Sequence, residues 1–301
     1  MSRNPVLNDN VFGESTTDQR PSPAQEWDAA QGAGAARAGA ALPNALPPTQ
    51  APAPGGPFTP ATGGKVMTLG GVSAATLFMF AFLLIGAAWG WGQVTQGTPT
   101  IGLDGTSVTP VEFDSPGLLI GCLLGAFVIA IVTVFKPKLA RFTAIPFALL
   151  EGAVLGMISH FYNAQFSGIV IQAILATFGV FLAMLVLYGL RILRATPKFT
   201  KGVIAATCGI MVLYLGSFVW GLVTGNSVSF LNDASPLSIG ISVIIVIVAA
   251  LNLILDFDFI ERGSKNDLPA YMDWYAAFGL VLTLVWLYLE MLRLLGKLRG
   301  N

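Results

Sequence analysis

The sequence has few charged side chains for its length. In 301 residues, 16 Lys and Arg balance 16 Asp and Glu, which together make up 11% of the chain, whereas 54% of the residues are hydrophobic. Soluble domains carry about a quarter of their residues as charges, so this chain could not cover a water-facing surface, and a soluble globule is excluded. The zero net charge also argues against a nucleic-acid partner, because such proteins need a basic face.

Cysteine and histidine are scarce as well. Cys122 and Cys208 both lie in apolar segments and are interpreted as packing residues rather than a disulfide or metal pair. His160 is the only histidine, and neither an HExxH zinc motif nor a GxSxG nucleophile motif occurs. We therefore expect no enzyme and no cofactor. A retinal protein is also disfavoured, because the last apolar segment offers no lysine between Asn266 and Gly296.

Residues 1–64 differ from the rest of the chain in composition. This segment holds ten of the 18 prolines, with Ala, Gly, Gln and Thr between them, and eight of the 32 charges. Such a composition buries too little apolar surface to offset chain entropy, which predicts a disordered, cytoplasmic tail before a membrane domain at 65–301. The tail lacks the apolar core of a signal peptide. It is either inert or a contact segment, for example through NPVLNDNVF at 4–12.

Charge-free blocks dominate the chain after Lys65. A helix needs about 20 apolar residues to cross the hydrocarbon core, and these blocks are continuously apolar rather than alternating, which favours helices over a barrel. The prediction is an all-α, polytopic bundle of seven transmembrane helices in contact with the lipid bilayer. The expected spans are 67–91, 117–136, 142–161, 168–190, 202–224, 236–257 and 272–296.

Loop charges predict the orientation of the bundle. The connections at 136–141 and 191–201 carry only bases, whereas those at 92–116 and 225–235 carry only acids. This alternation places the N-terminus in the cytoplasm. Seven crossings would then put Arg293, Lys297 and Arg299 on the other side, against the positive-inside rule. Either the last helix is re-entrant or central, or other signals of the bundle override these three bases.

Apart from Asp273, which opens the last span and is interpreted as interfacial, four acids remain in or at the edge of the apolar segments, where an ionisable group is costly and points to function. They are Glu151, Asp256, Asp258 and Glu290. Asp256 and Asp258, two residues apart, should point to opposite sides of a helix. Asp256 lies deeper and is the strongest candidate for a proton sensor or an ion path, while Asp258 could instead be a solvated interfacial charge.

Glu151 and Glu290 each leave a structural alternative open. Glu151 is either a protonated acid bonded between helices or part of a conduction path. Glu290 is either functional or paired with Arg293 three positions later. Two carboxylates that meet in a bundle do not both ionise freely, because desolvation and like charge disfavour the second negative charge. Such a pair could hold a proton at low pH and accept a cation as pH rises, and oxygen ligands also suit Ca²⁺.

Three segments together resemble the Bax inhibitor-1/YccA family of membrane proteins, in particular its bacterial branch. They are RATPKFTKGVIAATCGIM before the fifth span, LILDFDFI at the end of the sixth, and VWLYLEMLRLL in the seventh. The resemblance covers the chain from about residue 62 to its end. It implies seven helices with a central last helix, in a bacterial plasma membrane.

The resemblance also implies a pH-sensitive calcium leak controlled by carboxylates on the sixth and seventh helices. In this sequence those positions are Asp256 and Glu290, which would also form a calcium site, with Ca²⁺ as the permeant ion rather than a cofactor. Glu290 stands where the family usually has Asp, and the segment between the two acids is longer than usual. A break near Gly279 would bring the acids together. The alternative function is a non-transporting interaction protein that modulates a membrane protease or a stress response.

Overall fold

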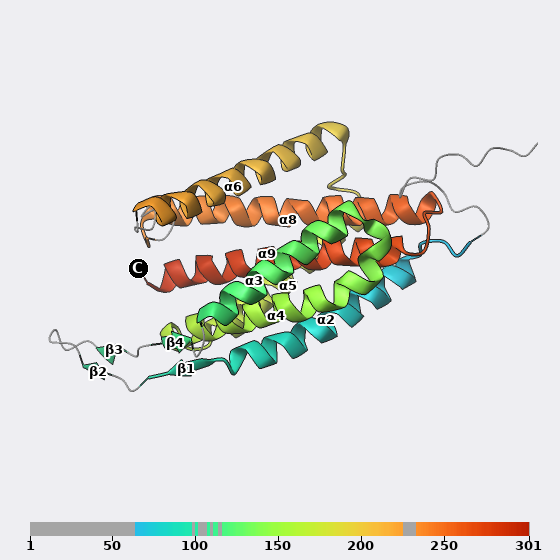
Figure 1. The fold of residues 1–301 in the computed structure, drawn as a ribbon. Coiled ribbons are helices and arrows are strands. Elements are labelled where there is room, and N and C mark those ends of the chain that lie inside the picture. The colour runs from blue at the N-terminus through green and yellow to red at the C-terminus, as the bar shows by residue number, and fades with distance from the viewer. Residues whose placement is uncertain are drawn as a thin grey trace, which may run out of the picture. The chain divides into compact units, whose positions relative to one another are not determined.

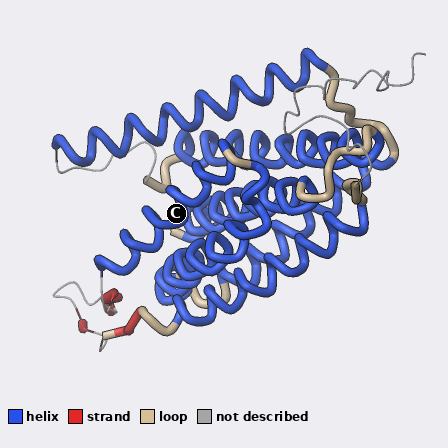
Figure 2. The backbone as a smooth tube through the Cα atoms, turned by 45° about the vertical axis from the view of Figure 1, so that its right-hand side comes forward, coloured by secondary structure: helices blue, strands red, loops and turns tan. Residues whose placement is uncertain are grey.

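The structure is a computed structural model of the full chain. It describes residues 64–97, 100–101, 107–108, 111–113, 116–224 and 233–300. The predicted tail at 1–64 lies outside this part of the chain except for Gly64. Figure 2 shows that the described residues are almost entirely helical, with short strands gathered at one end.

Seven helices of the described residues are long and apolar enough to cross a membrane, which confirms the predicted all-α bundle. The helices are α2 (Leu69–Trp91), α3 (Pro116–Phe135), α4 (Ala140–Gln165), α5 (Ile169–Gly189), α6 (Pro197–Thr224), α8 (Pro236–Lys265) and α9 (Met272–Arg299). A short 3-10 turn, η2 (Pro137–Leu139), joins α3 to α4. Two small antiparallel pairs, β1 (Val94–Gln96) with β4 (Val111–Phe113) and β2 (Thr100–Ile101) with β3 (Ser107–Val108), lie between α2 and α3.

Helix starts follow local capping signals. Thr68 accepts a hydrogen bond from the Gly71 amide at the start of α2, and Ser235 caps α8 ahead of Pro236. At the other boundary, α8 runs eight residues beyond the predicted span, because Arg262 and Lys265 form i, i+4 ion pairs with acids one turn earlier.

Helix α9 is the centre of the bundle. It packs against α2, α4, α5 and α8, and it lies between α8 and α4 in Figure 1. Its 28 residues form one unbroken helix of about 42 Å, long enough to span the hydrocarbon core. The last helix is therefore central rather than re-entrant, and the break near Gly279 that would have brought the two acids together is absent.

The segment that leads into α2 is clipped to the α8–α9 connection. The Met67 amide donates to the Leu268 carbonyl at 2.6 Å, and the Ala270 amide donates to the Lys65 carbonyl at 3.0 Å. Asp273 then accepts from the Thr68 amide at 3.0 Å. We call the end of the bundle that holds these contacts the clip end, and the opposite end, where α9 finishes and α8 begins, the far end.

Helices α2 and α4 approach each other through glycines. A Cβ on Gly90 would overlap the Ala153 carbonyl, and a Cβ on Gly152 would overlap the Leu83 carbonyl. Gly86 and Gly156 lie one turn away on the same interface, so each helix contributes a GxxxG pair. Small residues allow this backbone contact, which provides the close van der Waals packing that associates helices in lipid.

Candidate functional site

Helix α9 carries a stripe of polar side chains on one face. Thr283, Glu290, Arg293 and Lys297 are spaced by seven, three and four residues. At 3.6 residues per turn these positions fall within one quarter of the helix circumference. These four polar groups of α9 are therefore presented to one set of neighbours.

The neighbouring helices α6 and α8 carry matching stripes. Thr207 and Tyr214 lie seven residues apart on α6, while Ser238, Ser242, Asn252 and Asp256 repeat at heptad-like spacing on α8. We call the meeting of these three faces the polar seam. Its members are Thr207, Tyr214, Ser238, Ser242, Asn252, Asp256, Thr283, Glu290, Arg293 and Lys297.

Glu290 forms the central contact of the seam. The Tyr214 hydroxyl donates to Glu290 Oε1 at 2.6 Å, and Arg293 Nη1 donates to the same hydroxyl at 2.6 Å and to Oε1 at 3.5 Å. Glu290 is only 2% exposed, and its Oε2 has no hydrogen-bond partner among the described residues. Tyr162 of α4 also hydrogen-bonds Arg293, so three helices converge on this carboxylate.

Asp256 lies nearer the clip end. The Thr283 side chain forms a hydrogen bond with the Asp256 carboxylate. Asp256 Oδ1 also lies close to Gly279 on α9, since a Cβ added to Gly279 would be 3.7 Å from this oxygen. Its other oxygen, Oδ2, is buried without a hydrogen-bond partner in the described part of the chain. Buried polar atoms are normally paired, so these two carboxylate oxygens mark places where a proton, water or cation would be accommodated.

The structure gives Asp256 and Glu290 separate neighbours. Thr283, which contacts Asp256, precedes Glu290 by seven residues, or about 10 Å along α9. Because α9 is unbroken, nothing shortens this separation. Asn252, four residues before Asp256 on α8, lies one turn from Asp256 toward the far end. The two acids are therefore placed in series along the seam rather than as a hydrogen-bonded pair.

Glu151 and Asp258 lie away from the seam. Glu151 is half-buried on the side of α4 that faces α9, between Phe147, which packs on Phe278, and Ser159, which bonds Tyr288. Tyr288 lies on the side of α9 opposite the polar stripe, and Phe278 lies about 100° around the helix from the centre of the stripe.

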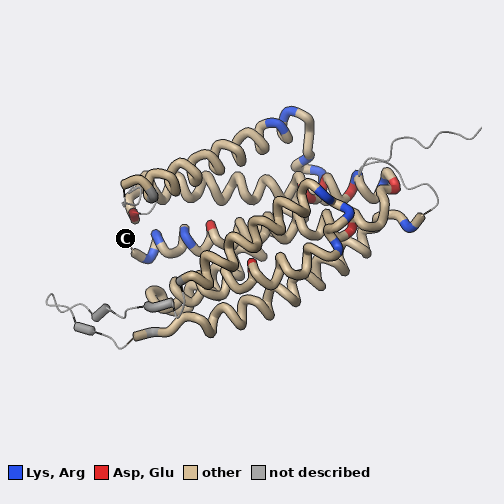
Figure 3. The backbone as a smooth tube through the Cα atoms, in the orientation of Figure 1, with Lys and Arg blue, Asp and Glu red and all other residues tan. Residues whose placement is uncertain are grey.

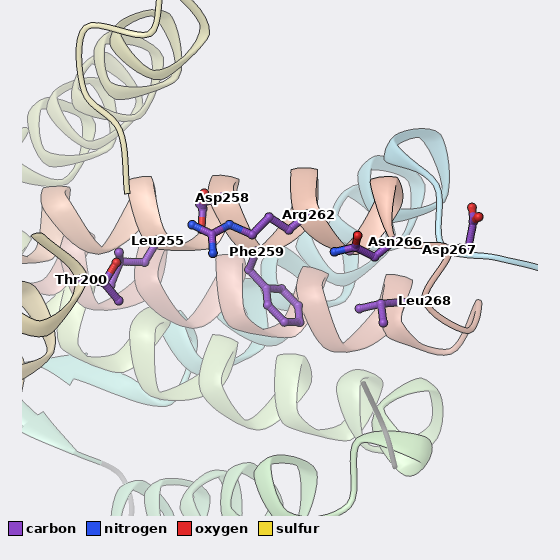
Figure 4. A pocket seen from close by; sticks show the side chains of 9 residues that line it. Thr200, Leu255, Asp258, Phe259, Arg262, Asn266, Asp267 and Leu268 are labelled. Atoms are coloured by element: carbon purple, nitrogen blue, oxygen red, sulfur yellow. The ribbon is translucent and has the colours of Figure 1, made fainter. Parts of the chain in front are cut away.

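Asp258 points to the other side of α8 from Asp256, as the two-residue spacing predicts. It pairs with Arg262 at 2.7 Å, and Arg262 also donates to the Ala195 carbonyl at 3.1 Å. Both residues line a clip-end pocket of about 680 Å³, where Figure 4 shows the Arg262 guanidinium beside Asp258 and directed toward Thr200 of α6. The rest of the lining on α8 and the α8–α9 connection consists of Leu255, Phe259, Gly263, Asn266, Asp267 and Leu268.

Sequence reasoning missed most seam residues other than the acids and Arg293. Tyr214, Asn252 and Lys297 are single polar residues in apolar helices, and each becomes informative only beside its partner. Asn252 donates to Thr207 at 2.9 Å, which links α8 to α6. The heptad spacing of polar residues on three separate helices was the available signal.

The three bases at the end of α9 are engaged within the protein. Arg293 bonds Tyr214, Lys297 bonds Ser238 and Ser242, and Arg299 bonds the Ser167 carbonyl and Gln172. Figure 3 shows them along the final turns of α9, apart from the larger group of charges at the clip end. Since internal hydrogen bonds hold these bases, they are weaker indicators of membrane orientation than bases in the connections between helices.

A central helix packed against four of the six other apolar helices, with ionisable groups inside the bundle, defines a polytopic α-helical membrane protein. The chain belongs to the Bax inhibitor 1 like family, whose family model matches residues 4–300. Searches of curated proteins and of solved structures found no match.

Proposed function

We propose that the protein is a pH-sensitive leak for Ca²⁺ or another cation, rather than an enzyme, and that the seam carboxylates control it. The observation that carries this proposal is the pair of buried, unpartnered oxygens on Asp256 and Glu290. Burying an ionisable acid in hydrocarbon costs free energy, so acids inside membrane segments commonly mark ion and proton pathways. Membership of the Bax inhibitor 1 like family supports the proposal.

In this proposal the two acids act in series. Asp256 receives a cation from the clip end, and Glu290 receives it about 10 Å farther along the seam. Protonation removes the negative charge of either acid, which weakens cation binding and closes the path. Arg293 competes with the cation for Glu290, because it already lies 3.5 Å from Oε1. Glu151 and Asp258 are not part of the proposed path, since neither lies on the seam.

The proposed location is a bacterial plasma membrane with the clip end toward the cytoplasm. The support is the distribution of bases, because 136–141 and 191–201 both connect helices at the clip end and carry only positive charge. The tail would then also be cytoplasmic.

The test is Ca²⁺ flux into proteoliposomes at acidic and at neutral pH. Asp256→Asn and Glu290→Gln keep side-chain size but carry no negative charge at any pH, so each should lower the flux at neutral pH and flatten its pH dependence. Asp258→Asn is the matched control, because Asp258 lies off the seam on the same helix. It should leave the pH profile unchanged.

Two results would contradict the proposal. One is a pH profile that neither seam variant alters. The other is a wild-type protein that carries no flux, which would favour the interaction protein. In that case deletion of residues 1–64 should abolish binding of a membrane-protein partner.

A further inference from the structure

Lys297 is a buried cation held by oxygen atoms. Its ammonium donates to Ser238 Oγ and to Ser242 Oγ, each at 2.8 Å, and the Ser238 carbonyl lies at 3.4 Å. Lys297 is 7% exposed, while Ser238 and Ser242 are 0% and 1% exposed. Lysines are almost never this buried without a charged partner, so the way in which the protein stabilises this ammonium calls for an explanation.

The oxygen atoms come from one helix turn of α8. Ser238 and Ser242 are four residues apart, so their hydroxyls lie on the same face, one above the other. Hydroxyl and carbonyl oxygens are hard ligands for metal cations, and this set carries no charge. A neutral oxygen set suits a monovalent cation, whereas Ca²⁺ sites in proteins draw on carboxylates. The Lys297 ammonium has the charge of such a monovalent ion.

The charges around Lys297 do not neutralise it by contact. Those that act on it are Arg293, Glu290 and Asp233. Glu290 already interacts with Arg293 and Tyr214, and no ion pair of Lys297 within 4.0 Å exists among the described residues. The serine oxygens are therefore the groups that compensate the desolvation of the ammonium.

We propose that Ser238 and Ser242 form a binding site for a monovalent alkali cation and that Lys297 is its built-in occupant. The ammonium is a cation tethered to α9 by its own stem, and it occupies the far end of the polar seam. Release of Lys297 would open the site to a free ion. This second role, as a plug, rests on the proposed cation leak, whereas the site itself does not.

Binding is tested first, without any flux measurement. Full-length Lys297→Ala in detergent is unfolded thermally in potassium chloride and in choline chloride at equal ionic strength, since choline is too large for the serine oxygens. Potassium should raise the Tm of this variant by about 3 °C or more, because a ligand of the folded state stabilises it by mass action. The wild-type protein should show no such difference.

Two controls isolate the site. The triple variant Ser238→Ala/Ser242→Ala/Lys297→Ala should lose the potassium effect, because the hydroxyl ligands are gone. Arg299→Gln removes an exposed base from the same turns of α9, and it should behave like the wild type. Equal Tm values of Lys297→Ala in the two salts, or a potassium effect that persists in the triple variant, would overturn the site.

The plug is tested by potassium flux in proteoliposomes. Lys297→Ala should leak at least severalfold faster than the wild type, and added methylammonium, which restores a free ammonium, should slow it again. The double variant Ser238→Ala/Ser242→Ala keeps Lys297 but removes the hydroxyls that hold its ammonium, so this variant should also leak faster than the wild type. It replaces Lys297→Ala in the flux test if Lys297→Ala does not fold.

The outcomes separate the two proposals. If the wild type carries flux and neither variant accelerates it, the plug is overturned. The comparison of Tm values tests the site independently of any flux. Absence of flux from the wild type and from every variant overturns the proposed leak and the plug with it, and a potassium-dependent Tm in Lys297→Ala would still support the site.

Discussion

The glycine interface between α2 and α4 and the polar seam of α6, α8 and α9 join helices in opposite ways. At the glycine interface backbones touch, since a Cβ at Gly90 would overlap the Ala153 carbonyl. At the seam, side chains bridge the helices through hydroxyls, a carboxylate and bases. Close packing leaves no room for another group. Side chains that bridge two helices can instead exchange partners with a proton or an ion, so the close backbone packing and the exchangeable polar contacts lie on different helix pairs.

Helix α6 shows the consequence most clearly. It packs mainly on α8, and most of its apolar side chains, such as Met211, Leu215 and Trp220, are exposed. Its inward face is attached by Thr207 and Tyr214, both hydrogen-bonded to seam residues. The position of α6 therefore depends on polar contacts, whereas that of α2 depends on backbone packing.

The largest effect is expected from Gly90→Leu in the glycine interface. The new side chain would meet the Ala153 backbone, which cannot move aside without separating α2 from α4, and the destabilisation should be about 3 kcal/mol or more. The matched control is Gly209→Leu on α6, where a Cβ meets nothing within 4 Å. Thermal unfolding in detergent compares the two variants. Equal losses would show that the α2–α4 contact is not special.

A smaller but still large effect is expected from Arg293→Met in the seam. This change leaves the buried Glu290 without its charged partner, which should cost about 3 kcal/mol at neutral pH. The double variant Glu290→Gln/Arg293→Met removes both charges and should recover most of the loss in the same unfolding measurement. A double variant no more stable than Arg293→Met would show that the pair does not act as a unit.

Tyr214→Phe should have a moderate effect. It removes the hydroxyl that donates to Glu290 and accepts from Arg293 while keeping the ring, and the loss should be about 1–2 kcal/mol. Because Tyr214 attaches α6 to α9, hydrogen exchange of α6 amides should accelerate more than that of α2 amides. Uniform acceleration in both helices would contradict a local attachment of α6.

The smallest effect is expected from Asp258→Asn at the clip end. Its pair with Arg262 is an exposed i, i+4 contact, with 61% of the Arg262 side chain accessible, so its loss should cost about 0.5 kcal/mol or less. Chemical denaturation can measure the difference. A loss as large as that of Arg293→Met would mean that the clip-end pocket contributes to stability as much as the seam does.

Much of the fold is predictable from the sequence because the bilayer imposes it. Charge-free blocks of sufficient length must become helices, and every predicted span overlaps an observed one, with differences of a few residues at most ends. The largest difference is at the end of α8, which continues eight residues past the predicted span. This added segment is ion-paired through Asp258, Glu261, Arg262 and Lys265. Hydropathy ends a span where charges begin, but helical hydrogen bonding continues past that point.

The candidate site is less predictable. The acids Asp256 and Glu290 stand out because carboxylates are rare in hydrocarbon. Their relation to each other depends on whether α9 is straight, and a straight α9 places Asp256 beside Thr283 and Glu290 beside Tyr214. The sequence marks Lys297 only through its conflict with the positive-inside rule. Its contacts could not be predicted, because Ser238 and Ser242 lie more than 50 residues away along the chain.

The scarcity of charge by itself determined that this protein is a helical membrane bundle and that only a few ionisable groups lie within its apolar segments. The reason is that hydrocarbon tolerates neither unpaired backbone groups nor charges without cause. Only the tertiary structure decided which polar groups meet, since the contacts join α4, α6, α8 and α9 across long sequence separations. Helix packing, and not local composition, placed Asp256 and Glu290 in series and enclosed Lys297 between two serines.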